Sequence, residues 1–167
     1  TLKTHTPSTP GDRAGSIIIS PAGQLPTTVP VTLRSLAPAG KTKFGGTLTG
    51  GNGRGVNTGV TEYYQLNVPR HSPALNASVT LGDNPDNDTS AWLIDPNAQA
   101  EAYQSNELVT VNNGSLEAQP TLGTNLHVIN PVAGRWTLAI DFAPQVSGTA
   151  LSEPYRVRLD QKAPDIS

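Results

Sequence analysis

The segment DNPDNDTSAWLIDPN, residues 83 to 97, gathers the acidic side chains best placed to do chemistry in this chain. Its oxygen-bearing side chains include Asp83, Asn84, Asp86 and Asp88. Calcium takes about six to eight oxygen ligands from such side chains and from backbone carbonyls. The spacing is not that of an EF-hand, because Ile94 stands where the twelfth position requires a glutamate. The loop is predicted to be a structural turn or, through Asp83, Asn84, Asp86 and Asp88, a calcium site; Asp95 fits an ordinary DPN turn better.

Catalysis by these carboxylates is the weakest of the three interpretations of this loop. Glycoside hydrolysis needs two carboxyl groups opposed across a cleft, one of them kept protonated by burial, and a solvated Asn/Asp turn does not supply that. The histidines His5, His71 and His127 do not lie near a nucleophile-elbow serine motif, and they form no i, i+4 pair for zinc. No catalytic residue is therefore predicted in the chain.

Exposed aromatic side chains offer a second chemistry, the stacking of sugar rings. The candidates for such a platform are Trp92, Tyr63 and Tyr103. Trp136 begins an alternating apolar face and is predicted to lie in the core. Trp92 is ambiguous, because apolar residues alternate onto both faces of its segment. A carbohydrate-binding surface therefore stays open as an alternative.

The composition narrows the possible partners. The 167 residues carry a net charge of −2, only 14% of them are charged, and the basic residues are scattered along the chain. Nucleic acids and anionic membranes require a clustered basic face, so neither is expected as a partner. There is no cysteine, which excludes disulfides and thiolate zinc sites. No apolar run approaches the length of a membrane span, and the chain reads as a piece of a longer polypeptide.

The elements that must position these residues are predicted to be short β-strands. Apolar residues alternate with polar ones at 64–68, 75–81, 135–142 and 155–160, which is typical of half-buried antiparallel strands. Weaker strands are expected at 15–20, 28–36, 43–50, 91–95, 107–111 and 125–130. Residues 98–106 form the only helix-like window. About ten strands separated by turn sequences predict an all-β chain of two packed antiparallel sheets.

The domain organisation follows from Pro and Gly positions. The segment SLAPAGK resembles a hinge, and it predicts a boundary near residue 38. Residues 1–38 are then an N-terminal strand pair, the end of a preceding domain; residues 39–162 are the sandwich domain, and 163–167 a linker. Pro30 has no N–H for a sheet ladder, so its strand is expected at an edge.

Three motifs together resemble a known family. They are the TEYYQLNVP strand, the Asp-rich turn leading to WLIDPN, and NPVAGRWTL. This combination resembles the pre-peptidase C-terminal type of β-sandwich, which follows the catalytic domain in secreted bacterial proteases, and residues 11–38 look like the segment before it in actinobacterial subtilisin-like proteases (subtilases). The resemblance implies a jelly-roll (galactose-binding-like) sandwich and secretion. It also implies attachment to a serine-protease domain and no catalytic residues in this part.

The main functional hypothesis is a non-catalytic accessory domain of a secreted subtilisin-like protease, which stabilises the parent or helps it engage substrate. Its partners are then other domains of the same polypeptide and a protein or polysaccharide substrate. The alternative is a carbohydrate-binding module that uses Trp92, Tyr63 and Tyr103. A third option is a cell-surface structural or adhesion domain. Calcium is the only cofactor that the sequence suggests.

Overall fold

A computed structural model describes residues 5, 7–49, 60–82, 84–142 and 152–161 of the chain. Twelve β-strands form within these ranges, and no helix does. The strands are β1 (Gly11–Ile19), β2 (Thr27–Ser35), β3 (Lys41–Thr49), β4 (Thr61–Val68), β5 (Ala74–Leu81), β6 (Thr89–Ile94), β7 (Ala100–Ser105), β8 (Glu107–Asn112), β9 (Ser115–Pro120), β10 (Gly123–Ile129), β11 (Gly134–Phe142) and β12 (Ser152–Gln161). None of the described residues belongs to a helix that is long and apolar enough to cross a membrane.

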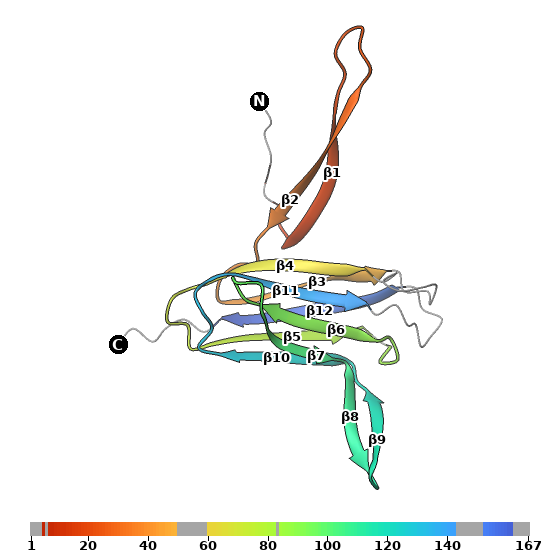
Figure 1. Cartoon of the computed structure of the whole chain (residues 1–167), viewed down its shortest axis with the longest axis vertical. Helices are drawn as coiled ribbons and strands as arrows, with labels where there is room; N and C mark the ends of the chain where they lie inside the picture. The colour runs from red at the N-terminus through yellow and green to blue at the C-terminus, as the bar shows by residue number, and fades with distance from the viewer. Residues whose placement is uncertain (1–4, 6, 50–59, 83, 143–151, 162–167) are drawn as a thin grey trace.

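Eight of these strands form two four-stranded antiparallel sheets that pack face to face (Figure 1). One sheet has the order β10-β5-β12-β3 and the other β4-β11-β6-β7. Along the chain these eight strands pair from the outside inward: β3 pairs with β12, β4 with β11 and β5 with β10. The middle two, β6 and β7, pair with each other. This nesting is the connectivity of a jelly roll. The all-β sandwich and its jelly-roll topology are thus confirmed.

The core lies between the two sheets and is built by the predicted alternation. The largest buried side chains are Trp136, Phe142, Leu48, Leu66, Leu75, Leu93, Leu138, Ile140 and Leu159. Trp136 is fully buried, as predicted, and its indole Nε1 donates to the Val132 carbonyl at 2.8 Å. Each sheet therefore turns one set of side chains inward and leaves the alternate set on an outer face.

Two hairpins extend from opposite edges of the sandwich (Figure 1). One is the pair β1 and β2, which meets the body where Gly11 lies against the Tyr64 ring and where the Ala37 N–H donates to the Gln65 carbonyl at 2.8 Å. Pro30 lies in β2, which pairs with β1 alone within the described chain, so the expected edge position is confirmed. The domain division at residue 38 stays a prediction, and the linker at 163–167 lies outside the described residues.

The second hairpin, β8 and β9, and the strand before it correct the sequence prediction. Residues 98–106 were expected to be helix-like, but they contain β7, which pairs with β6. Pairing with a neighbouring strand outweighs the helix propensity of its alanines. Strand β9 was not predicted, because its sequence SLEAQP has only two apolar side chains and its register is set by pairing with β8.

Candidate functional site

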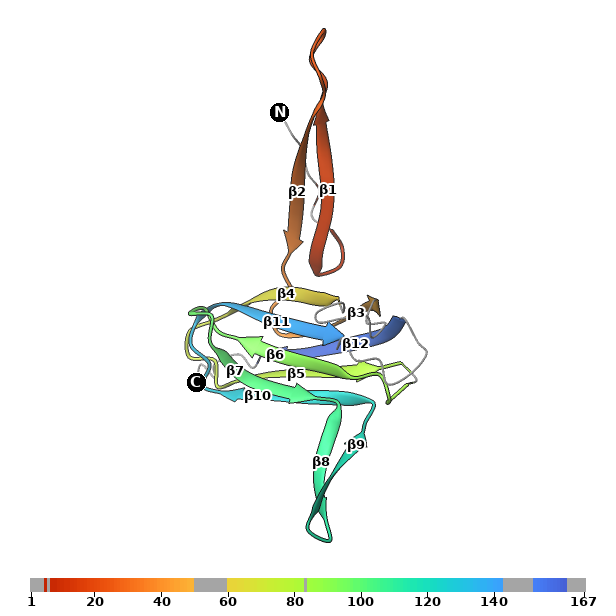
Figure 2. The same cartoon turned by 45° about the vertical axis from the view of Figure 1, so that its right-hand side comes forward.

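The three aromatic residues of the carbohydrate hypothesis lie in one row on the outer face of the β4-β11-β6-β7 sheet. Tyr63 on β4 is opposite Ala139 on β11, Ala139 is opposite Trp92 on β6, and Trp92 is opposite Tyr103 on β7. The row therefore crosses all four strands, which run side by side in Figure 2. We call the residues Tyr63, Ala139, Trp92 and Tyr103 the aromatic row.

The rings of the aromatic row are open to solvent. Tyr103 is 59% exposed and Tyr63 is 46% exposed, while Trp92 is half-buried. The Trp92 and Tyr103 ring centroids lie 5.1 Å apart with their planes tilted by 40°. The Tyr103 hydroxyl lies 3.3 Å from the Ser90 Oγ, which helps to hold that ring in place. These two rings form a continuous apolar surface over β6 and β7.

Ala139 is the small residue of the row, between Tyr63 and Trp92. Although its side chain belongs to the outer face, it is only 4% exposed, because neighbouring side chains cover it. Tyr63 and Trp92 flank it from the strands on either side, about 10 Å apart at two strand spacings. The alanine side chain is much shorter than the rings on either side of it. A ligand that lies across the strands would therefore contact the rings before it contacts the sheet.

Hydrogen-bonding side chains border the aromatic row on both sides. On one side Thr61 donates to Asp141 Oδ1 at 2.7 Å, in the same cross-strand row as Ser90. On the other side the Arg135 guanidinium donates from Nε to Asn67 Oδ1 at 2.8 Å and from Nη1 to Gln65 Oε1 at 3.1 Å. An apolar strip between donors and acceptors matches a molecule that has apolar ring faces and hydroxyl edges.

The Asp-rich loop is held by hydrogen bonds within the protein. The Asn84 Oδ1 accepts from the Asp86 N–H at 3.1 Å, and the Asn87 amide donates to the buried Glu153 carboxylate, which also accepts from the Gly82 N–H at 2.8 Å. Asn106, which the sequence did not single out, bridges the loop to its surroundings. Its Oδ1 accepts from the Thr89 N–H at 2.8 Å and its Nδ2 donates to the Pro85 carbonyl at 2.8 Å. These bonds are those of a structural turn.

The predicted calcium ligands are only partly gathered. Asp83 lies outside the described residues, and among the rest no group of three or more His, Asp or Glu side chains is placed to hold a metal. Asp95 accepts from the Asn97 and Gln99 N–H groups, each at 2.8 Å, as in an ordinary turn, and these bonds lower its pKa. Calcium binding at Asn84, Asp86 and Asp88 stays a prediction.

Asp88 has a different electrostatic character from Asp95. Burial raises the pKa of the Asp88 carboxyl, and the nearby negative charges of Glu107 and Asp141 raise it further. Its ionised form is therefore less favourable in the folded protein than in water. Of the histidines, His127 bonds to the Asn76 side chain, and His71 lies in a turn with φ 61°.

The comparisons with known proteins add little to this geometry. No family model and no curated protein matches the sequence, so the pre-peptidase resemblance stays a prediction. Among solved structures, PliG of Aeromonas hydrophila, a periplasmic inhibitor of g-type lysozyme, is similar at 15% identity and a TM-score of 0.43, over 73% of this chain and 86% of that chain. A structure from the carbohydrate-binding modules of the β-sandwich superfamily is similar at 11% identity and a TM-score of 0.29, over 92% of this chain and 73% of that one. Likenesses this low carry no argument about function.

Proposed function

We propose that this chain is a non-catalytic carbohydrate-binding module, and that the aromatic row is its binding site. The observation that carries the proposal is the register of the sheet, which places Tyr63, Trp92 and Tyr103 in one line on an outer face. Soluble proteins rarely leave aligned aromatic side chains uncovered unless the surface serves binding. A sugar ring has apolar faces that stack on aromatic rings, and Tyr and Trp offer both an apolar plate and a polar handle.

The length of the aromatic row indicates the form of the ligand. From Tyr103 to Tyr63 the row crosses three strand spacings, about 14 Å, which exceeds the size of one sugar ring. The site therefore fits a chain of several sugars that lies across the strands. Thr61, Asp141 and Arg135 at its borders would then bond the hydroxyl groups along the edges of that chain.

Tryptophan fluorescence gives a direct test. The sequence has two tryptophans, and Trp136 is fully buried, so a change in emission on adding a polysaccharide reports Trp92. We expect neutral, unbranched polysaccharides to shift or quench the emission and to retard the protein in affinity electrophoresis. Interface aromatics of this kind cost about 2 kcal/mol or more when truncated, so Trp92→Ala should weaken binding about 30-fold.

Matched variants make the test specific. Trp92→Phe keeps a ring and should retain most of the affinity, whereas Tyr63→Ala should lose less than Trp92→Ala because Tyr63 stacks alone. Ile129→Ala removes an exposed apolar side chain from the outer face of the other sheet and should change nothing. Absence of binding across a broad panel of neutral polysaccharides, or equal binding by Trp92→Ala, would overturn the proposal.

The role as an accessory domain of a secreted subtilisin-like protease is an extension of this proposal, and the motif resemblance supports it. A module that binds a polysaccharide would hold an attached protease near a substrate embedded in that polymer. In that arrangement the chain itself cleaves nothing, and the purified protein should leave casein intact over an extended incubation. Hydrolysis of casein that survives rigorous purification would contradict the non-catalytic assignment.

A further inference from the structure

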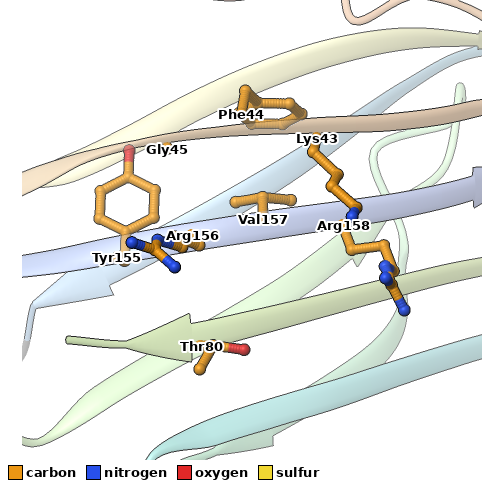
Figure 3. A pocket seen from close by; sticks show the side chains of 8 residues that line it. All are labelled: Lys43, Phe44, Gly45, Thr80, Tyr155, Arg156, Val157 and Arg158. Atoms are coloured by element: carbon orange, nitrogen blue, oxygen red, sulfur yellow. The ribbon is translucent and has the colours of Figure 1, made fainter. Parts of the chain in front are cut away.

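The outer face of the other sheet, β10-β5-β12-β3, carries a cluster of positive charge. Lys43 on β3 and Arg158 on β12 are directly opposite each other, and Arg156 lies on β12 two residues before Arg158. All three are exposed and line the same shallow depression. Figure 3 shows the Lys43 side chain extending from β3 toward β12 and the Arg158 side chain extending from β12 away from β3. We call Lys43, Arg156 and Arg158 the basic face.

Within the described chain none of the three cations of the basic face forms an ion pair with a carboxylate, although Asp160 lies two residues after Arg158 on the same face of β12. Among all the described residues, the ion pairs are Arg34 with Asp12 on the first hairpin, at 2.6 Å, and Lys41 with Asp160, at 4.0 Å. The chain as a whole has 13 acidic residues and a net charge of −2, so acidic partners are not scarce. Like charges directly opposite on neighbouring strands destabilise a sheet, and a bound anion would relieve that repulsion at Lys43 and Arg158.

The surface beside these cations is kept open by a glycine. Gly45 lies opposite Arg156, and a Cβ there would come within 2.4 Å of the Tyr155 carbonyl oxygen. A side chain is therefore excluded at position 45, and the Arg156 guanidinium has clear sheet surface next to it. On its other side Arg156 is opposite Thr80, whose hydroxyl can donate to an anion, and Arg158 is opposite Ser78, whose hydroxyl donates to Asn125 Oδ1 at 2.8 Å.

We propose that the basic face binds an acidic polysaccharide whose charged groups are carboxylates. The planar guanidinium matches a carboxylate with two parallel hydrogen bonds, and the chain presents two of them. Arg156 and Arg158 are about 7 Å apart along the strand and Lys43 about 5 Å across it. Cations in this arrangement can meet successive acidic groups of one extended chain. The site is separate from the aromatic row and does not depend on the function proposed there.

Other polyanions fit the basic face less well. Single-stranded nucleic acids need aromatic side chains on which bases stack, but the aromatics closest to these cations, Phe44 and Tyr155, turn into the sandwich. Duplex nucleic acid is typically held through more phosphate contacts than three cations can make. An anionic membrane usually takes up an apolar helical face as well, and the described chain has no helix.

The test uses polygalacturonate as the probe, and its fully methyl-esterified form as the uncharged control with the same sugar chain. Titration calorimetry of the full chain at about 20 mM salt should show binding to the acid form only, weakened at least fivefold at about 300 mM salt, where charges are screened. Arg156→Gln with Arg158→Gln should reduce affinity at least tenfold. Arg13→Gln with Arg70→Gln removes the same charge from exposed positions elsewhere and should leave binding intact.

Each other outcome counts against the proposal. Binding that is absent at low salt, or unchanged in the Arg156/Arg158 variant, removes the site. Equal losses in the two double variants would show that only overall charge matters. Tighter binding of duplex DNA, or of phosphatidylserine vesicles, at the same salt would overturn the ligand class. Trp92→Ala should bind polygalacturonate as well as the unchanged protein does, so the failure of one site is distinguishable from the failure of the other.

Discussion

On the β4-β11-β6-β7 sheet, one outward cross-strand row reads Tyr63, Ala139, Trp92 and Tyr103, whereas a row on the opposite sheet reads Lys43, Arg158, Ser78 and Asn125. Both rows cross four antiparallel strands, and both arise from the same inward and outward alternation. One presents apolar rings between hydrogen-bonding borders, and the other presents cations that form no ion pair within the described chain. The sandwich thus has two outer faces that are built by the same strand arrangement and carry different chemistry.

The largest expected effects come from substituting each face in turn and measuring the affinity of each variant for both ligands. Trp92→Ala should lose about 30-fold in affinity for a neutral polysaccharide and nothing for polygalacturonate. Arg156→Gln with Arg158→Gln should show the reverse. Both affinities are measured by calorimetry on the same preparations, with thermal melts to confirm folding. If either variant weakens both ligands equally, the two faces do not act as separate sites.

The two sheets are joined inside the sandwich by a tyrosine pair, which should matter to stability and to neither ligand. The Tyr64 hydroxyl from one sheet bonds to the Tyr155 hydroxyl from the other, and both side chains are buried. Tyr155→Phe leaves the Tyr64 hydroxyl without this partner, so we expect a loss of about 1–3 kcal/mol in the free energy of unfolding. Tyr64→Phe with Tyr155→Phe should lose less than the single variant, as judged by urea unfolding.

The same pair predicts a dependence on alkaline pH. Burial raises the pKa of both tyrosines, and for Tyr155 the hydrogen bond shared with Tyr64 raises it further. Above about pH 10 the unfolded chain therefore releases protons that the folded chain keeps, and stability falls as pH rises. The double phenylalanine variant should show a shallower alkaline decline. An identical decline in both proteins would mean that other groups cause it.

The two faces should also differ, by a smaller factor, in how strongly their ligand affinities depend on salt. Binding at the aromatic row buries neutral surface, so its affinity should change less than twofold between about 20 and 300 mM salt, over which the screening length shortens severalfold. Binding at the basic face should fall at least fivefold over that range. Parallel salt titrations check this, and a steep salt dependence for the neutral polysaccharide would place charge in the aromatic site.

The smallest expected effect concerns Asp88 at the end of the aromatic sheet. Because its pKa is raised above the ordinary 3.8, ionisation costs stability in the folded protein, and that cost is present at neutral pH and vanishes as pH falls below 3.8. Asp88→Asn should raise the melting temperature at pH 7 by about a degree or two and leave it unchanged near pH 3. A lower melting temperature at pH 7 would contradict the assigned sign.

The same variant addresses the calcium prediction. If the Asp-rich loop binds calcium, EDTA should lower the melting temperature of the unchanged protein by several degrees and affect Asp88→Asn less. If the loop is only the turn that Asn87, Asn106 and Glu153 build, EDTA should change neither protein. Thermal melts with and without EDTA decide between these outcomes.

Much of the fold was predictable because side-chain alternation is local. The strands around Leu66, Val79, Trp136 and Val157 carry a clear two-residue period, and each of these side chains is buried. The helix expected at 98–106 was wrong because pairing with β6 outweighs the helix propensity of its alanines, and that pairing cannot be read from the local sequence. The basic face was missed for a related reason. Its cations looked scattered along the chain, so no clustered basic surface was expected, yet folding brings three of them together.

Thus, where apolar and polar residues clearly alternate, the sequence by itself determined which side chains point inward and which outward, since the pleat of a strand turns successive side chains to opposite faces. For Trp92 it left both faces open. It could nominate Tyr63, Trp92 and Tyr103 as aromatics, but it could not align them. Register across strands is set by the nested pairing of segments far apart in the chain, as with Lys43 and Arg158, and by the packing of one sheet on the other. Only the tertiary structure therefore decided that one face gathers rings and the opposite face gathers charge.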